Sequence, residues 1–286
     1  MNDNILEVKN LRKVYPGFVL DNVNFSIPYG SIMGFIGENG AGKSTTINAI
    51  LNLVSKDGGE VKYGDSILTD NDKQIKEEIG VVYDSIYFYP TLTIPKIEKI
   101  SKNAYSKWDS KVFDKYLTQF KLPLDKEIKT FSKGMNMKLA IAVALSHHPK
   151  LLILDEATSG LDPVVRDEIL DIFLDFVQDE HHSILISSHI TSDLEKVADG
   201  ITFIHEGKIV FSKSKDELIY DYGIVKCNSN QFNQIDKEDR IVYRKHDYEW
   251  EVLVSDKKKF AKKYNGFVID NPSIEDIMLL YIKGAK

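Results

Sequence analysis

The feature that most constrains this chain is a glycine-rich segment, Gly37-Glu38-Asn39-Gly40-Ala41-Gly42-Lys43-Ser44. It fits the phosphate-loop pattern of glycine, four residues, glycine, lysine and serine or threonine. An apolar strand at Ile32–Ile36 precedes it, and a helix is expected from Lys43 to about Val54. Glycines let backbone amides point inward around phosphates, Lys43 reaches the terminal phosphates, and Ser44 offers a hydroxyl to Mg²⁺. The predicted nucleotide contacts are Gly37, Asn39, Gly40, Ala41, Gly42, Lys43, Ser44 and Thr45.

Composition excludes several other classes of protein. Of the 286 residues, 43% are hydrophobic and 28% are charged, which is enough for a full core and excludes a disordered chain. No apolar run reaches the ~20 residues of a membrane-spanning helix, and the first residues carry no secretory signal. The lone cysteine, Cys227, is expected in the core, and a cytoplasmic location fits best. The net charge of −6 argues against sequence-independent binding to nucleic acid.

Strand and helix patterns alternate along most of the chain. Short strands are predicted at Ile5–Val8 and Phe18–Ile27, and buried strands at Leu151–Leu154 and Ser183–Ser187. The segment from about residue 87 to residue 148 shows mainly helical patterns, which predicts a helical insertion. Strands that alternate with helices favour a parallel sheet, so the chain is predicted to be of the α/β class.

The C-terminal residues predict a small α+β unit. Side chains that alternate as in a strand stand at Tyr248, Trp250, Val252 and Val254, and a closing helix is expected near Ile274–Ile282. A short helix from about Lys215 to Tyr220 ends the preceding region. We therefore expect a large domain at residues 1–218 and a small one at residues 219–286.

A second polar feature is the pair Asp155 and Glu156, which directly follows the apolar strand Leu151–Leu154. The carboxyl ends of parallel strands form the edge at which α/β sheets bind ligands. Two acids after a strand are usually an ordinary loop, but here a phosphate loop is also present. Asp155 is therefore predicted to belong to the coordination shell of Mg²⁺. Glu156 is predicted to act as the general base toward the attacking water.

Five motifs occur in one order along the chain. They are the phosphate loop, Phe131-Ser132-Lys133-Gly134-Met135, Asp155-Glu156, Ser159-Gly160-Leu161-Asp162, and His189 after Ser187-Ser188. In order and approximate spacing they resemble the ATP-binding cassette of ABC transporters, over roughly residues 5–215. The resemblance implies a P-loop NTPase with a parallel-sheet core, an N-terminal antiparallel β subdomain, a helical insertion and, here, a small C-terminal α+β appendage. It also implies ATP and Mg²⁺.

The resemblance assigns further roles, because two cassettes of this family meet head to tail. Ser132 and Gly134 would contact the γ-phosphate held by the opposite phosphate loop, and Asp162 would lie at the dimer seam. His189 would contact the γ-phosphate. Tyr15 stands where the family has an aromatic ring that stacks on adenine. The predicted catalytic residues are Lys43, Glu156 and His189.

Several positions depart from the family pattern, among them Met137-Lys138, which stands where glutamine-arginine is usual. Lys133 and Met135 replace a glycine and a glutamine, and Lys133 could either add charge near the γ-phosphate or face solvent. Asp84 stands where many members have a glutamine that links Mg²⁺ to the transport domain, and its carboxylate is still a suitable ligand. The predicted metal ligands are Ser44, Asp84 and Asp155. Next come Tyr87-Phe88-Tyr89, of which at least one ring is expected to reach a partner surface.

Together the motifs predict an ATPase subunit that dimerises around two Mg-ATP and powers a separate membrane permease from the inner face of the cell membrane. The second cassette could be an identical or a related chain. The tail Pro272-Ser273-Ile274-Glu275-Asp276-Ile277 resembles those of bacterial exporters of antimicrobial peptides, drugs or toxins, which favours export of a peptide or drug-like substrate. Two alternatives stay open: a soluble cassette ATPase of the iron–sulfur assembly type, and an importer ATPase.

Overall fold

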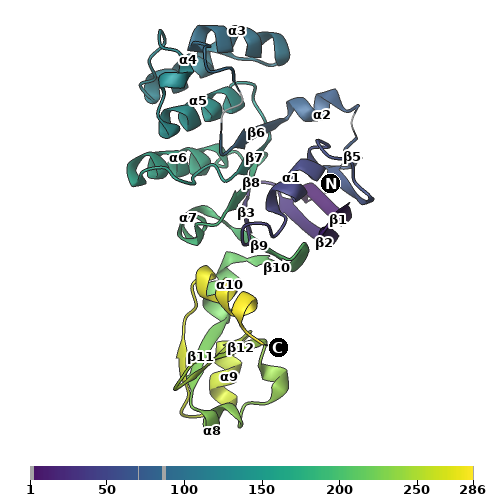
Figure 1. Ribbon diagram of the computed structural model, residues 1–286, viewed down its shortest axis with the longest axis vertical. Coiled ribbons are helices and arrows are strands. Elements are labelled where there is room, and N and C mark those ends of the chain that lie inside the picture. Colours follow the sequence, from purple (N-terminus) through teal and green to yellow (C-terminus); the bar gives the residue numbers. More distant parts are fainter. Residues whose placement is uncertain (1–2, 70, 86–87, 286) are drawn as a thin grey trace.

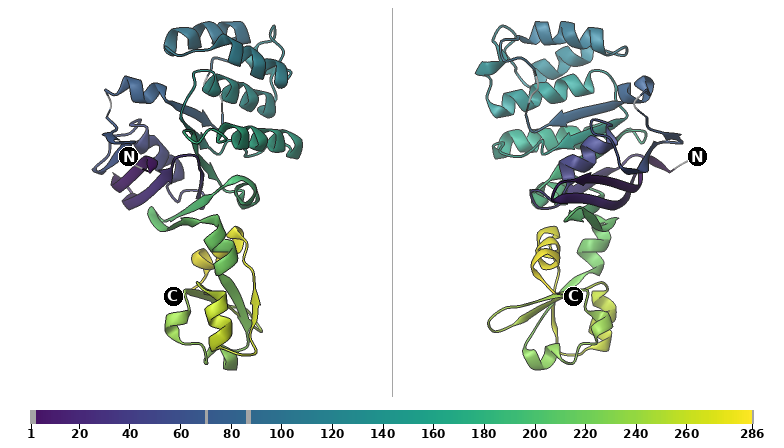
Figure 2. Two further views of the ribbon diagram at one scale, coloured as in Figure 1. Left: turned by 180° about the vertical axis from the view of Figure 1, so that it is seen from behind. Right: turned by 45° about the vertical axis from the view of Figure 1, so that its right-hand side comes forward.

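The computed structural model describes residues 3–69, 71–85 and 88–285 as an elongated molecule with three sheets (Figure 1). A six-stranded sheet lies in the middle, with a four-stranded N-terminal sheet beside it. The third sheet, formed by residues after 218, lies at one end, and the helices of residues 94–145 form the other end (Figures 1 and 2). Within the described residues, no helix is both long enough and apolar enough to span a membrane.

The central sheet consists of β3 (Ile32–Ile36), β6 (Ile79–Tyr83), β7 (Leu151–Asp155), β8 (Ser183–Ser188), β9 (Gly200–His205) and β10 (Lys208–Ser214). Their order is β10-β9-β3-β8-β7-β6, and all neighbours run parallel except the hairpin of β9 and β10. Strands β3, β7 and β8 are buried along their whole length, as is usual for parallel strands covered on both faces. Their carboxyl ends therefore lie side by side at one edge.

Three helices follow these adjacent strands: α1 (Lys43–Ile50) after β3, α6 (Pro163–Phe176) after β7, and α7 (Thr191–Val197) after β8. Helix α1 is shorter than the predicted span to Val54. Asn52 explains the difference, because its φ of 55° is the left-handed conformation that commonly ends a helix.

The N-terminal sheet has the order β2-β1-β4-β5 and is antiparallel, as the sequence resemblance implies. Its strands are β1 (Asn4–Tyr15), β2 (Phe18–Pro28), β4 (Gly58–Tyr63) and β5 (Ser66–Ile67), and the short helix α2 (Lys73–Glu77) follows. Strand β1 continues well past the predicted Ile5–Val8. Its buried side chains and those of β2 share one core with Ile153 of β7 and Leu185 of β8, so this sheet is fixed to the central one.

The helical insertion contains α3 (Ile94–Ala104), α4 (Ser110–Gln119), a 3₁₀ turn at Ile128–Thr130 and α5 (Lys133–Leu145). Tyr87, where the insertion was expected to begin, lies outside the described residues. Helix α5 packs against both α4 and β6, and most of its C-terminal half is buried. The insertion is thus joined to the central sheet through α5.

The C-terminal sheet is antiparallel and has the order β12-β13-β11-β14. It consists of β11 (Gly223–Cys227), β12 (Val242–Lys245), β13 (Trp250–Val254) and β14 (Val268–Asp270), with α8 (Ser229–Phe232) and α9 (Lys257–Lys263) beside it. Cys227 is buried, as predicted. Strand β13 begins at Trp250 rather than at Tyr248. Tyr248 is 95% exposed and lies in a turn, which is closed by a hydrogen bond of 2.8 Å from the His246 amide to the Glu249 carbonyl.

The last helix, α10 (Ile274–Lys283), packs back against the central region of the molecule. Tyr281 contacts Phe203 of β9 and Phe211 of β10, with ring centroids 6.1 and 5.7 Å apart. The Ile274 amide donates to Glu195 Oε1 of α7 at 2.7 Å. The short helix expected at Lys215–Tyr220 is a π-helical turn at Glu217–Asp221 that leads into β11.

Candidate functional site

The loop from Gly37 to Gly42 joins β3 to α1 in a conformation that requires glycine. Gly40 and Gly42 have φ values of 84° and 115°, which side-chain-bearing residues rarely adopt. A Cβ atom on Gly42 would lie 2.7 Å from a methyl group of Leu20, and one on Gly37 would lie 2.5 Å from the Ile204 carbonyl oxygen. Backbone and packing thus hold the loop at the N-terminus of α1, where the helix dipole favours an anion.

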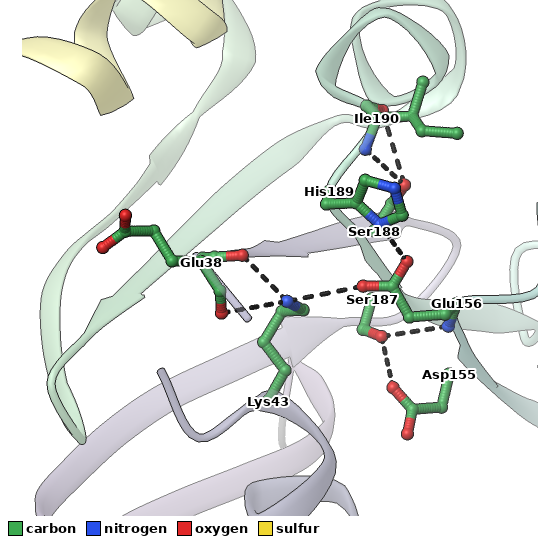
Figure 3. A network of polar contacts seen from close by, with 9 residues as sticks. Glu38, Lys43, Asp155, Glu156, Ser187, Ser188, His189 and Ile190 are labelled. Carbon is green, nitrogen blue, oxygen red and sulfur yellow. Dashed lines mark hydrogen bonds and ion pairs between the residues drawn. The ribbon is translucent and has the colours of Figure 1, made fainter. Parts of the chain in front are cut away.

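Lys43, the first residue of α1, lies across this loop (Figure 3). Its side chain is 6% exposed, and Nζ donates to the Gly37 carbonyl at 2.8 Å and to the Glu38 carbonyl at 3.3 Å. Nζ also lies 3.4 Å from Glu156 Oε1. The amine therefore sits inside the phosphate loop and faces the carboxylate that follows β7.

Asp155 and Glu156 point in different directions from the end of β7 (Figure 3). Asp155 is buried, and Oδ1 accepts a hydrogen bond from Ser187 Oγ of β8. The Glu156 amide donates to the same hydroxyl at 3.1 Å. Glu156 has a φ of 56°, a left-handed conformation that costs about 1–2 kcal/mol for a residue with a Cβ. Ser187 thus fixes both acids, a role that the sequence motif did not reveal.

His189 completes a chain of contacts that begins at Lys43. Its Nδ1 lies 2.6 Å from Glu156 Oε2, and its side chain is 47% exposed. Ser188 Oγ accepts from the Ile190 amide at 2.9 Å, which turns the chain from β8 into α7 and holds His189 at the sheet edge. The structure therefore brings together the three predicted catalytic residues, Lys43, Glu156 and His189.

The three predicted metal ligands also meet in one place. A cleft of about 570 Å³ is lined by Ser44, Asn48, Leu53, Val54, Tyr83, Asp84, Asp155 and Glu156. Ser44, Asp84 and Asp155 offer a hydroxyl and two carboxylates, the hard oxygen donors that suit Mg²⁺. No cluster of three or more acidic, histidine or cysteine ligands occurs in the part of the chain that the structure describes. The donor set therefore fits an ion that completes its shell with water and phosphate oxygens.

A smaller cavity of about 220 Å³ covers the phosphate loop. Its lining includes Asn39, Gly40, Gly42, Lys43, Ser44, Thr45 and Glu156, together with Phe18. Phe18 also lines the adjoining cavity of about 390 Å³ beside Glu38–Ala41, so its ring borders both spaces. Sequence reasoning missed Phe18, although it pairs with Tyr15 across the β1–β2 turn. Tyr15 itself is 37% exposed, with Lys13 Nζ 5.3 Å from its ring centre.

Ser132, Gly134 and Asp162 line neither the 570 Å³ cleft nor the cavity over the phosphate loop. Ser132 caps α5, because its Oγ accepts from the Met135 amide at 3.2 Å. Asp162 caps α6 in the same way, through the amides of Val164 and Val165. A Cβ on Gly134 would lie 3.3 Å from Val165, so the two helix starts adjoin. Within one chain, these residues form a second surface apart from Lys43.

Two departures from the family pattern also have definite positions. The Lys133 side chain lies over Gly160, because a Cβ atom on Gly160 would be 3.0 Å from Lys133 Nζ. With Tyr83, Asp84 and Asn136, Lys133 borders a separate groove of about 520 Å³ between β6 and α5. Tyr89 is 80% exposed and Phe88 packs on the core, so one of the two described rings of the aromatic cluster is exposed.

Comparison with known proteins agrees with this geometry. Residues 20–159 match the family model described as ABC transporter. The bacitracin transport ATP-binding protein BcrA of Bacillus licheniformis is 33% identical over 255 residues, which cover 86% of this chain and 81% of that protein. The lantibiotic transport ATP-binding protein SrtF of Streptococcus pyogenes is 38% identical over 215 residues, 74% of this chain and 92% of that protein.

Solved structures give the same result for the fold. A structure described as the ATP-binding subunit of an ABC transporter superposes with a TM-score of 0.68 at 28% identity, over 75% of this chain and 91% of that one. A nucleotide-free ATP-binding cassette has a TM-score of 0.65 at 23% identity and supports the fold alone. With its phosphate loop, paired carboxylates and these relatives, the chain belongs to the ABC transporter ATP-binding proteins and is an ATPase.

Proposed function

We propose that two copies of this cassette, or this cassette and a related one, close around two Mg-ATP and power a separate membrane permease. The observation that carries the proposal is the division of the site between two surfaces. Glu156 contacts both Lys43 and His189 at the sheet edge, whereas Ser132 and Gly134 lie at the start of α5. A second chain that presents its α5 start to this Lys43 would complete the polar surroundings of the phosphates.

The contacts of Lys43 suggest how binding and hydrolysis are linked. Before ATP enters, its amine is paired with Glu156. A triphosphate in the loop would draw the amine to phosphate oxygens and free the Glu156 carboxylate to accept a proton from the attacking water. His189 would keep that carboxylate oriented and contact the γ-phosphate. Ser132 and Gly134 of the opposite chain would stabilise the charge that develops in the transition state.

The remaining roles follow from position. Ser44, Asp155 and Asp84 would hold Mg²⁺, which neutralises phosphate charge when bound. Tyr15 would stack on adenine, with Phe18 beside it. Asp162 would lie at the seam between the cassettes. We treat residues 1–218 as the cassette and 219–286 as an appended domain whose role is separate from these contacts.

Export of a peptide or drug-like compound is the direction we favour. The relatives BcrA and SrtF are named for the transport of bacitracin and of lantibiotics. The exposed Tyr89 and the groove beside Asp84 would receive the permease, which would hold the cassette at the inner face of the cell membrane. No feature of the described residues favours the importer or the iron–sulfur assembly alternative over this arrangement.

The Glu156→Gln variant tests the proposal. The change keeps the size of the side chain and its contact with His189 but removes the base, so hydrolysis should fall about 10²–10⁴-fold while ATP binding persists. Gel filtration with Mg-ATP should then show a stable dimer of the variant. Glu180→Gln, a change at an exposed position after α6, serves as the control with normal hydrolysis. Normal turnover by Glu156→Gln, or a strict monomer in ATP, would contradict the assignment.

A further inference from the structure

Positive charge is concentrated at the helical end of the molecule. Residues 94–133 contain ten lysines and five carboxylates, a net charge of +5, whereas the whole chain carries −6. The rest of the chain therefore carries −11. The helical end of this acidic protein therefore has a positive electrostatic potential, opposite in sign to the net charge of the whole chain.

Most of these lysines are exposed and lack an acidic partner. Within the described residues, no carboxylate lies within 4 Å of Lys96, Lys99, Lys111, Lys115, Lys121 or Lys126, and we call these six the helical-end lysines. Lys96, Lys99 and Asn103 follow the spacing of one face of α3, and all three are exposed. The buried side chains of α3, at Ile94, Ile97 and Ser101, point the other way.

Exposed apolar side chains lie among these lysines. Ile100, next to Lys99 on α3, is 48% exposed, and Leu124, between Lys121 and Lys126, is 52% exposed. Lysines interspersed with exposed apolar side chains on a helical surface are typical of contact with an anionic lipid surface. The groove of about 520 Å³ beside Asp84, which would suit a protein segment, is lined by none of the helical-end lysines.

The other lysine-rich helix, α9, lies at the opposite end and differs in its surroundings (Figure 1). Lys263 is paired with Asp236 and Asp239, and residues 219–286 hold 12 basic and 11 acidic side chains. Lysine content alone is therefore similar at the two ends, but only the helical end carries a marked excess of positive charge.

We propose that the helical-end lysines bind the headgroups of anionic phospholipids, as a contact with the membrane that is independent of the permease. Each lysine near an anionic surface contributes about 1 kcal/mol, or about fivefold in partitioning. Several lysines acting together give the cassette a reversible affinity for the membrane and orient its helical end toward it. This affinity raises the concentration of the cassette where a permease is found.

Sedimentation of the full chain with vesicles tests the proposal. The protein should bind vesicles of phosphatidylcholine mixed with phosphatidylglycerol and not vesicles of phosphatidylcholine alone. Raising salt from about 0.1 to about 1 M, which shortens the Debye length from about 10 to about 3 Å, should release it. Lys96→Gln/Lys99→Gln should lower partitioning about 25-fold. The matched control is Lys258→Gln/Lys262→Gln on α9, which should bind as the unchanged protein does.

Three outcomes would overturn the proposal. The first is that the protein does not bind the anionic vesicles. The second is that the α3 and α9 variants lose vesicle binding equally. The third is that the α3 variant still binds the anionic vesicles but no longer binds the permease in detergent. The last outcome would identify the surface as a protein contact. ATP hydrolysis by the α3 variant in solution should be unchanged, so failure here is distinct from failure of the ATPase mechanism.

Discussion

Arg166 of α6 faces Asp193 of α7, with Nη1 3.8 Å from Oδ1 of a carboxylate that is only 4% exposed. The same guanidinium donates from Nη2 to the Leu161 carbonyl at 3.0 Å. Arg166 thereby joins the Ser159–Asp162 segment to the helix that follows His189. Two motifs that lie apart in the sequence are connected by one side chain.

Removing Arg166 should therefore destabilise the protein strongly. In Arg166→Leu the Asp193 carboxylate stays buried without its partner, which costs about 3 kcal/mol. Urea unfolding monitored by circular dichroism measures the loss. The double variant Arg166→Leu/Asp193→Leu should recover much of it, because no uncompensated charge remains.

A pair on the same two helices supplies the control. Lys196 and Asp167 lie 3.2 Å apart but are 62% and 66% exposed. Lys196→Gln should change the free energy of unfolding by less than about 1 kcal/mol. Equal losses at the two pairs would show that burial of Asp193 is not the cause.

Lys43→Met should weaken ATP binding about ten- to hundredfold, because charged hydrogen bonds to the phosphates are lost. At a concentration of ATP about 100 times Kd, binding stabilises the unchanged protein by about 2.7 kcal/mol. A thermal-shift titration should show this effect sharply reduced in the variant. Lys208→Met, at an exposed position on β10, should retain the full shift.

Gly42→Ala should destabilise the protein more than Gly17→Ala, although both glycines have positive φ. The backbone strain alone is worth about 1–2 kcal/mol at each site. At Gly42 the new methyl group would also lie 2.7 Å from Leu20 and 3.0 Å from Phe18, whereas at Gly17 it would meet no atom within 4 Å. Comparison of the two unfolding midpoints isolates the crowding. Identical costs would exclude close packing as the reason for Gly42.

Acid should weaken the fold through His147. Burial lowers the pKa of this imidazole, which stacks on Tyr105 with ring centres 4.1 Å apart. Below pH ~6.5 the unfolded state takes up a proton that the folded state does not, so stability falls by up to about 1.4 kcal/mol per pH unit as pH decreases. His147→Phe keeps an aromatic ring for the stack and should show a shallower loss between pH 7 and pH 5 than the unchanged protein. Parallel curves for the two proteins would refute the assignment.

The sequence was most informative where the determinants of structure are local. The phosphate loop and the strand before Asp155 each depend on neighbours within a few residues. Phe18, Ser187 and Arg166 were missed because their roles depend on residues distant in the chain. The alternating pattern from Tyr248 to Val254 placed the start of the strand two residues too early, because a turn and an exposed strand end can share the same short pattern of side chains.

The packing of α10 on Phe203 and Phe211 has a consequence for synthesis of the chain. The β9–β10 hairpin leaves the ribosome before the helix that covers it, and Gly207 at its turn donates to the Ala41 carbonyl of the phosphate loop at 3.0 Å. Until α10 has been translated, Phe203 and Phe211 of this hairpin lack their contacts with Tyr281. The hairpin that contacts the phosphate loop therefore reaches its full packing only after α10, a helix far along the chain from it, has been made.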